Sequence, residues 1–399
     1  MRVLLVNHFP LQGSGSGIYT MNIAKELVNQ GHEVFVVDID NQVDTNDYNF
    51  ERYTIMCDKS KNPEAKLSFN FPCFTTHPRS SLTYYDLNEE QIQEYINVYM
   101  QTIRAVISDF KPDVIHAQHL WLAPYVASKT NIPYVITAHG TDLMGFKKDE
   151  RYRKYALEAS QKAAFVIAIS KQVYQETQEL YHISNEKLIL NPNGFDETVF
   201  NIKPVKREDA LRELDLPQNS EKIVSFVGKL TDFKGVDILI KAAKIVTEKI
   251  PNVIFALAGN GQLRDDLEKL AKDLGLNNIY FLGHKNQNQV ATLYNLAEVS
   301  VVPSRIEPFG LVALEAMACG TPVVATNAGG LPDFVNKKVG ALVEMNNPEE
   351  LASALISEIS QQTKLTKGKF ANKYTLENFS WSKTLGKVID LYELAIEDF

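Results

Sequence analysis

Short apolar runs alternate with helical patterns along the whole chain, and this alternation restricts the fold more than any other feature. Runs of this length, separated by amphipathic segments, predict a parallel β-sheet with helices on both faces. In the first half, the predicted strands are Val3–Val6, Val34–Val37, Val114–Ala117, Tyr134–Ala138 and Phe165–Ala168, with a helix at Thr20–Gln30.

A turn at Asn191–Gly194 and a polar stretch reaching Pro217 interrupt the alternation, which then restarts. At 399 residues the chain is long enough for two domains, so we expect an α/β fold with two doubly wound sheets. Phe379–Phe399 has the pattern of an amphipathic helix that covers a sheet. The strands predicted for the second half are Ile223–Val227, Val253–Ala258, Ile279–Leu282, Val299–Val302 and Pro322–Ala325.

Charge and cysteine content argue against several classes of partner. The net charge of −8 does not favour nucleic acid, and it argues against strong binding to an anionic membrane. A basic run at 147–154 contains acidic residues, so we interpret it as a solvated helix face and expect peripheral membrane contact at most. Three cysteines without a Cys-x-x-Cys pair, and an N-terminal apolar run too short for a signal peptide, predict a cytosolic protein.

One carboxylate, Glu315, lies inside a helix pattern that is otherwise apolar on every side, from Leu311 to Cys319. Such a helix should be buried, and a buried charge is unfavourable unless a partner binds it. Pro308-Phe309-Gly310 opens this helix after an apolar run, which directs backbone N–H groups at an anion such as phosphate. From Gly310 to Glu315 the helix rises about 7.5 Å, roughly the distance from a diphosphate to a ribose. Glu307 lies on the other side of the helix start, where it could hold a sugar.

A turn with two lysines, Lys229 and Lys234, follows the first predicted strand of the second half. Two cations around one turn can converge on an anion, although solvated lysines are the common alternative. Glycines after two further predicted strands, at Gly259-Asn260-Gly261 and Ala328-Gly329-Gly330, predict two loops that approach a ligand closely at the same rim.

The first predicted strand is followed by a glycine loop, Gly13 to Gly17, and the fourth by His139. With Asp38, the loop imitates a dinucleotide fingerprint, but Thr20 replaces the third glycine and the loop is long. His139 after a strand can reach a ligand or anchor a loop. For His116 and His119 we expect core or supporting roles, and no histidine and carboxylate spacing predicts a metal site.

The order of these motifs resembles glycosyltransferase family 4, the retaining, nucleotide-sugar-dependent enzymes of GT-B fold. The resemblance implies two Rossmann-like domains facing a cleft, with the C-terminal helix crossing back to the N-terminal domain. It implies an acceptor-binding N-terminal domain, residues 1–197 with 378–399, and a nucleotide-sugar-binding C-terminal domain, residues 198–377. The likeness runs nearly end to end and rests on the glycine loop, His139-Gly140, Asn193-Gly194, Gly228 with Lys234-Gly235, Glu307 with Glu315, Gly329-Gly330 and Trp381.

Roles follow residue by residue from this resemblance. Lys229 and Lys234 match the basic pair that neutralises the leaving diphosphate, with Lys229 where arginine is common. Glu307 matches the residue that holds donor-sugar hydroxyls, and Glu315 matches the one on the ribose. The resemblance also implies donor contacts at Gly17, Gly228, Gly261, Phe309, Gly310 and Leu311, acceptor contacts at Gly15, Gly17 and Asp142, and a place for His139 near the reacting centre.

The expected activity is metal-independent transfer of a hexosyl unit from a nucleotide diphosphate sugar, with uridine as the expected base, to an acceptor hydroxyl. The sequence shows no side-chain nucleophile, so we expect retention by departure and attack on the same face of the sugar. No cofactor is expected besides the nucleotide sugar co-substrate. The alternatives are a sugar-nucleotide epimerase of the same architecture, a binding protein that has lost catalysis, and an NAD-dependent oxidoreductase.

Overall fold

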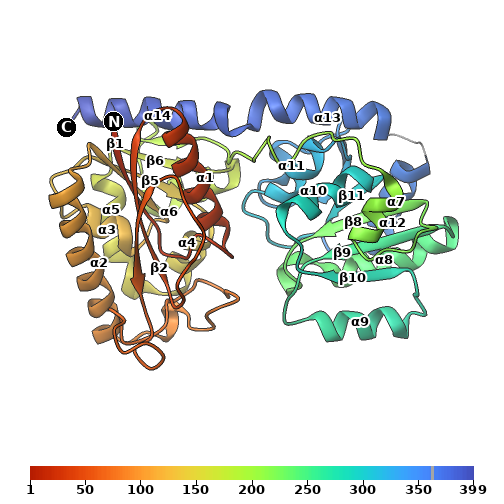
Figure 1. Cartoon of the computed structure of the whole chain (residues 1–399), viewed down its shortest axis with the longest axis horizontal. Helices are drawn as coiled ribbons and strands as arrows, with labels where there is room; N and C mark the ends of the chain where they lie inside the picture. The colour runs from red at the N-terminus through yellow and green to blue at the C-terminus, as the bar shows by residue number, and fades with distance from the viewer. Residues whose placement is uncertain (361–363) are drawn as a thin grey trace. The chain divides into compact units, whose positions relative to one another are not determined.

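The chain consists of two compact units, each built on one parallel β-sheet (Figure 1). The computed structural model describes residues 1–360 and 364–399. The first unit comprises Met1–Asn193 with Trp381–Phe399, and the second comprises Gly194–Ser380, a few residues from the expected boundaries. The predicted α/β class with two Rossmann-like sheets is confirmed.

The sheet of the first unit has the order β3-β2-β1-β4-β5-β6-β7, and its strands are parallel. The order reverses between β1 and β4, and ligands of such sheets bind beyond the carboxyl ends of the strands at this reversal. The strands are Arg2–Val6 (β1), Glu33–Asp40 (β2), Glu51–Met56 (β3), Val114–Gln118 (β4), Tyr134–Ala138 (β5), Phe165–Ala168 (β6) and Leu188–Leu190 (β7).

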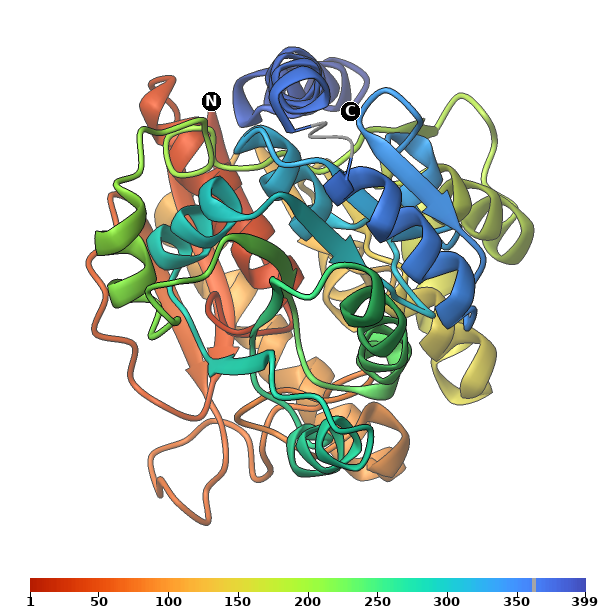
Figure 2. The same ribbon diagram turned by 90° about the vertical axis from the view of Figure 1, so that its right-hand side faces the viewer.

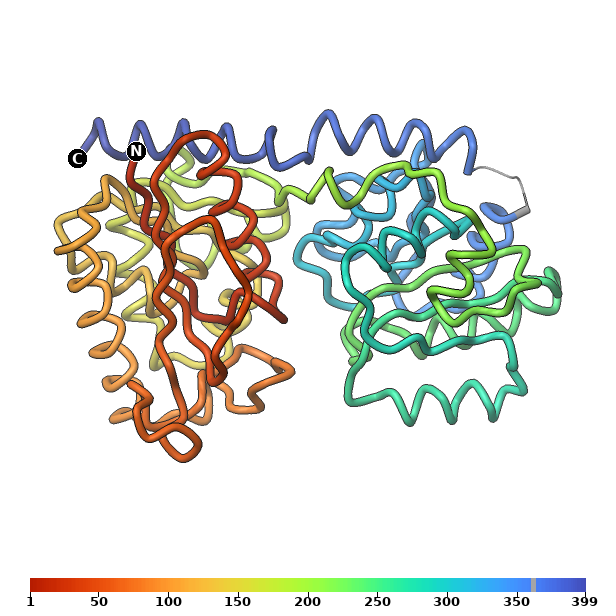
Figure 3. Tube along the Cα trace, viewed as in Figure 1, coloured from red at the N-terminus to blue at the C-terminus, as the bar shows by residue number. Residues whose placement is uncertain are grey.

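Helices cover both faces of this sheet because right-handed crossovers on either side of the reversal place them on opposite faces (Figure 3). Helix α14 packs with α1 over the sheet: Leu27, Leu385 and Tyr392 are fully buried in one apolar cluster. The expected final amphipathic helix is therefore confirmed, although it begins at Trp381. The helices are Gly15–Asn29 (α1), Glu89–Phe110 (α2), Leu122–Ala127 (α3), Thr141–Lys148 (α4), Arg153–Lys162 (α5), Lys171–Tyr181 (α6) and Trp381–Glu397 (α14), with 3₁₀ turns at Tyr84–Asp86 (η1) and Glu150–Tyr152 (η2).

The second sheet has the order β10-β9-β8-β11-β12-β13 and reverses between β8 and β11 (Figure 2). Neighbouring residues point to opposite faces: Val224 packs in the cluster under α8 and α12, whereas Ile223 packs in the cluster with Leu293 of α10. The strands are Lys222–Val227 (β8), Val253–Ala258 (β9), Ile279–Gly283 (β10), Val299–Val302 (β11), Val323–Thr326 (β12) and Gly340–Val343 (β13). The helices are Arg207–Glu213 (α7), Val236–Lys249 (α8), Arg264–Asp273 (α9), Gln287–Leu296 (α10), Leu311–Ala318 (α11), Pro348–Ser360 (α12) and Lys364–Phe379 (α13), with 3₁₀ turns at Asp232–Lys234 (η3) and Leu331–Asp333 (η4).

Candidate functional site

Glu307 lies in the loop between β11 and α11, where its carboxylate is paired with a lysine. Lys234 Nζ lies 2.6 Å from Glu307 Oε2, and Ser304 Oγ donates to the same oxygen at 3.0 Å. Glu307 is buried, whereas the Lys234 side chain is partly open to solvent. The structure thus brings together the carboxylate and the second lysine that the sequence singled out, and it holds them at the end of the sheet where its order reverses.

Lys234 is carried by the η3 turn, which packs tightly on the chain just before Glu307. Gly235, at the end of this turn, has φ +62°, and a Cβ added there would lie 2.0 Å from the carbonyl oxygen of Pro303. Only glycine allows this approach. The first lysine of the turn, Lys229, is exposed. Gly228 follows β8 at the same rim, and Gly261 in the next loop packs against the backbone of Leu230.

Helix α11 begins at Leu311, directly after Phe309 and Gly310. Gly310 caps the helix with φ +104°, and Phe309 is buried against Phe334. The first backbone N–H groups of a helix have no partner within it, and the helix dipole makes this end attractive to anions. The start of α11 follows Glu307 by a few residues, and anion binding there stays a prediction.

Glu315 lies in the middle of α11 and is 9% exposed, as the apolar helix pattern predicted. Its side chain has no hydrogen bond or ion pair to the described residues. Burial, with a smaller contribution from the charge of Asp196, raises the pKa of Glu315 to about 8. A hydrogen-bond donor from a ligand would relieve this unfavourable burial of the ionised form.

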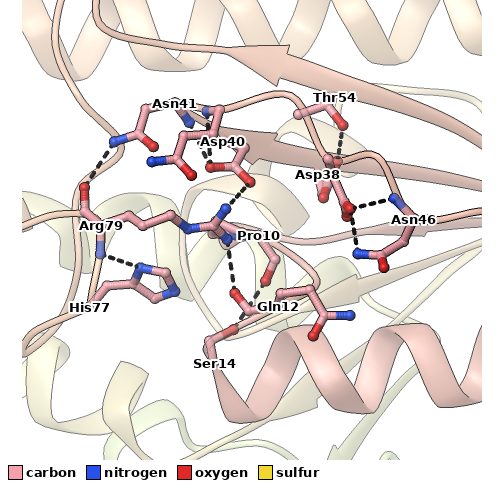
Figure 4. A network of polar contacts seen from close by, with 12 residues as sticks. Pro10, Gln12, Ser14, Asp38, Asp40, Asn41, Asn46, Thr54, His77 and Arg79 are labelled. Carbon is pink, nitrogen blue, oxygen red and sulfur yellow. Dashed lines mark hydrogen bonds and ion pairs between the residues drawn. The ribbon is translucent and has the colours of Figure 1, made fainter. Parts of the chain in front are cut away.

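The glycine turn of the first unit is held by the segment after β2, for which the sequence predicted no structure (Figure 4). Arg79 Nη1 lies 2.8 Å from Asp40 Oδ2, and Arg79 Nη2 donates to the carbonyl oxygen of Gln12 at 3.0 Å. The backbone of Arg79 is held in turn, since its N–H donates to His77 Nδ1. His77 packs directly under Gly13, where an added Cβ would meet its Nε2 at 2.9 Å.

Helix α1 begins at Gly15, so the expected start at Thr20 is wrong. Ser14 caps the helix by accepting a hydrogen bond from the N–H of Gly17, which compensates for the low helix propensity of the glycines. Gly15 and Gly17 therefore lie in the first helical turn. Gly17 packs on the chain itself, because an added Cβ would lie 2.1 Å from the carbonyl oxygen of Pro10, whereas Gly15 borders open space.

His139 follows β5 and is buried, and its ring is oriented by Gln118 of β4. Gln118 Oε1 lies 2.9 Å from His139 Nε2, and with the Gln118 amide in this orientation the ring nitrogen donates the hydrogen bond. Burial lowers the pKa of His139 to about 3, and the ring is therefore neutral, with an unprotonated Nδ1 that can accept a hydrogen bond. His116 and His119 are buried beside it, as expected for core or supporting histidines.

Asp142, expected at the acceptor, is fully buried and bound to the backbone. Its carboxylate accepts from the N–H of Leu120 at 2.7 Å and from the N–H of His139 at 3.2 Å. Burial raises its pKa to about 6, although hydrogen bonds from backbone N–H groups, that of Leu120 foremost, act in the opposite direction. In this structure Asp142 fixes the loop that carries His139, and its contact with an acceptor stays a prediction.

Comparison with known proteins identifies the family. A family model described as glycosyl transferases group 1 matches residues 207–373, and one described as glycosyltransferase family 4 matches residues 13–199. A D-inositol 3-phosphate glycosyltransferase of Corynebacterium jeikeium is 30% identical over 336 residues, which cover 78% of this chain and 79% of the relative. The chain belongs to the family 4 glycosyltransferases. An uncharacterized glycosyltransferase of Methanocaldococcus jannaschii is 29% identical and spans 96% of this chain and 95% of its own.

Solved structures share the fold of this glycosyltransferase. Sucrose-phosphate synthase of Thermosynechococcus elongatus superposes with a TM-score of 0.78 at 24% identity over all of both chains. Anabaena HepE, solved with UDP and glucose, superposes with a TM-score of 0.75 at 21% identity over 98% of both chains. The expected GT-B fold is confirmed.

Several residues of the glycosyltransferase site were not found from the sequence. Ser304 and Gln118 contact predicted site residues through ordinary polar groups, and nothing in their sequence context marks them. Arg305, two residues before Glu307, was also not found from the sequence, because its partners come from distant segments.

The basic run of the first unit is partly paired with acidic and aromatic side chains. Lys147 pairs with Glu176 at 2.6 Å, Arg151 pairs with Asp149 at 2.6 Å, and Lys148 lies over the Tyr85 ring. These contacts agree with a solvated helix face. Within residues 1–360 and 364–399, no helix is long and apolar enough to cross a bilayer.

Proposed function

We propose that this glycosyltransferase moves a hexosyl unit from a uridine diphosphate sugar to an acceptor hydroxyl, with retention at the anomeric carbon and without a metal ion. The observation that carries the proposal is the Lys234–Glu307 pair, held at 2.6 Å shortly before helix α11, whose amide N–H groups favour an anion. The Lys234 ammonium and the N–H groups at the start of α11 can bind a diphosphate, and the Glu307 carboxylate can bind the hydroxyls of the attached sugar.

In this proposal each donor group meets a different part of the site. Lys234 and Lys229 neutralise the diphosphate, the backbone of Phe309, Gly310 and Leu311 contacts its oxygens, and Gly228 and Gly261 border it. Glu307 holds sugar hydroxyls. Glu315 accepts hydrogen bonds from the ribose hydroxyls, which suits its buried carboxyl without a described partner. His139, Gly15, Gly17 and Asp142 serve the acceptor side, with Gly17 also meeting the diphosphate.

The proposed reaction breaks the bond between the anomeric carbon and the diphosphate oxygen. The acceptor oxygen bonds to the same face of that carbon, and its proton passes to the departing diphosphate. Positive charge develops on the sugar and negative charge on the diphosphate, so the lysines and helix start stabilise the transition state more than the ground state. Glu307 is committed to Lys234 and Ser304, which supports a role in binding hydroxyls over attack on the sugar.

Uridine and glucose are supported by one structural relative. HepE of Anabaena was solved with UDP and glucose, although its identity to this chain is only 21%. A cytosolic location with at most peripheral membrane contact is also proposed, supported by Cys57, Cys73 and Cys319, which are buried and form no disulfide among the described residues. Cell fractionation that recovers the protein outside the cytosol would contradict this location.

A thermal-shift screen tests the donor. UDP-glucose, GDP-mannose and ADP-glucose are added separately to the wild-type protein, and we expect UDP-glucose to raise the melting temperature most. The preferred donor is then incubated alone and analysed for a new sugar nucleotide, which would identify an epimerase instead. Chelator should leave turnover within about twofold of the untreated enzyme. A loss of activity that returns with a divalent ion would overturn metal independence.

A further inference from the structure

The guanidinium of Arg305 joins three separate segments of the second unit. Nη1 donates to the carbonyl oxygen of Asp232 in η3 at 2.7 Å, and Nη2 donates to Asp237 Oδ2 in the first turn of α8 at 2.9 Å. Nε donates to Asn346 Oδ1, after β13, at 2.7 Å. The side chain is only 21% exposed. Arg305 therefore ties the loop that leads to Glu307 to the turn that carries the catalytic lysine.

Backbone contacts hold the same two segments together. The N–H of Arg305 donates to the carbonyl oxygen of Phe233, next to Lys234, at 2.7 Å. On the other side of Lys234, Gly235 packs on the carbonyl of Pro303 without room for a side chain. The lysine thus lies between two points at which its turn is attached to the chain before Glu307.

Arginine is suited to this position and lysine is not. A planar guanidinium can donate in three directions at once, whereas an ammonium on a flexible chain cannot reproduce this fork. Burial alone would raise the pKa of Asp237, but the hydrogen bond and charge of Arg305 hold it below the usual value. Arg305 therefore also keeps the nearby carboxylate of Asp237 ionised and paired.

We propose that Arg305 is a positioning residue that fixes Lys234 Nζ against Glu307, and thereby sets where the ammonium meets the diphosphate of the donor. This inference rests on the proposed function, because it assumes a nucleoside diphosphate as the ligand of Lys234. It predicts that the effect of removing Arg305 passes through Lys234 and disappears when that lysine is absent.

A double-mutant cycle tests the proposal. UDP affinity is measured by calorimetry for the wild type, Arg305→Ala, Lys234→Ala and the double variant. We expect Arg305→Ala to lower the affinity for UDP about tenfold when Lys234 is present and less than about twofold in the Lys234→Ala background. Equal losses in both backgrounds, or wild-type affinity in Arg305→Ala, would overturn the proposal.

Further variants separate positioning from folding. Arg305→Lys keeps the positive charge but loses the planar guanidinium. We expect it to lower UDP affinity when Lys234 is present and to have little effect in the Lys234→Ala background. This variant tests the proposal even if Arg305→Ala is too unstable to measure. Arg207→Ala is the matched control: Arg207 donates to the carbonyl oxygens of Ser220 and Glu221 at the amino end of β8, and its loss should leave UDP affinity unchanged. If the wild type binds none of UDP, GDP and ADP, the proposed function fails and this inference fails with it. If the wild type binds UDP and the Arg305 variants bind it equally well, only this inference fails.

Discussion

The ligand-facing edges of the two sheets differ in how their polar groups are satisfied. In the first unit, His139 is bound to Gln118, and Asp142 is bound to backbone N–H groups. In the second unit, Glu315 is buried without a described partner. His139 and Asp142 thus have partners within the chain, although Gln118 Nε2 beside them has none among the described residues. The Glu315 carboxyl of the second unit is left to a ligand or to water.

This difference teaches which parts of the site depend on charge. A neutral histidine fixed by its neighbours recognises shape and hydrogen-bond direction, so its loss should affect the positioning of the reaction. The carboxylates and lysine of the second unit act by electrostatics, so their loss should affect donor binding and bond cleavage. Variants on each side should therefore separate affinity from turnover.

The largest effect is expected at the Lys234–Glu307 pair. Glu307→Ala or Lys234→Ala should lower transfer on the order of 10³-fold, because each removes a group that acts on the departing diphosphate or on the sugar. Both variants should still unfold cooperatively in thermal melts. Lys244→Ala removes an exposed lysine from α8 and serves as the control. Turnover near the wild-type value in either site variant would contradict these roles.

A smaller loss is expected on the first unit. His139→Ala should slow transfer about 100-fold, because it removes an oriented hydrogen-bond acceptor from the reacting centre, while UDP affinity stays within about twofold. Steady-state kinetics and calorimetry measure the two quantities. His182→Asn, at the exposed end of α6, is the control. If UDP affinity falls and turnover does not, the contrast between the two edges is wrong.

Glu315→Gln should weaken binding more than catalysis. Hydrogen bonds to a charged group contribute about 1.5–3 kcal/mol, so UDP affinity should fall roughly 10- to 100-fold at about pH 9, where the Glu315 carboxyl is ionised. Turnover at saturating donor should stay within about threefold of the wild type, since the ribose lies away from the reacting bond. Calorimetry with UDP and initial rates at high donor concentration provide the measurements. Unchanged UDP affinity would remove Glu315 from the donor site.

The smallest expected effect is a pH dependence of Glu315. Its pKa is about 8 in the folded protein, above the usual 4.5, so the folded protein keeps a proton that the unfolded chain loses. The contribution of this group to the free energy of unfolding is therefore fully present below pH 4.5 and decreases as pH rises toward 8. Ribose hydroxyls favour the ionised form, so UDP-glucose affinity should rise several-fold between about pH 6.5 and 9. Calorimetric titrations should show this rise in the wild type and a flat profile in Glu315→Gln, and equal profiles would contradict the assignment.

Local sequence patterns predicted most strands of the two sheets, because the central strands are continuous apolar runs. Tyr134–Ala138, Phe165–Ala168, Val253–Ala258 and Val299–Val302 were predicted at their observed bounds. Strand β3, Glu51–Met56, was missed because it lies at the sheet edge, and half of its residues are polar. The start of α1 was missed because Ser14 capping outweighs the glycines that follow.

The candidate site was predictable only where residues mark it along the chain. Glu315 stood out because a carboxylate in an apolar helix is unusual, and Lys234 stood out in a turn after a strand. Arg305 could not be found in this way, since Asp232, Asp237 and Asn346 reach it only through the folded sheet. The same holds for Arg79, which contacts Gln12 from a segment without any readable pattern.

Helix α14 belongs to the first unit, although it follows the whole second unit along the chain. Its Leu385 and Tyr392 complete the apolar cluster with α1, and Trp381 lies 5.5 Å from Tyr19 between ring centroids. While the chain emerges from the ribosome, that face of α1 stays uncovered until Trp381–Glu397 has been translated. The second unit has its sheet and helices available earlier, so it can fold before the first unit is finished, reversing the usual order in which domains fold during translation.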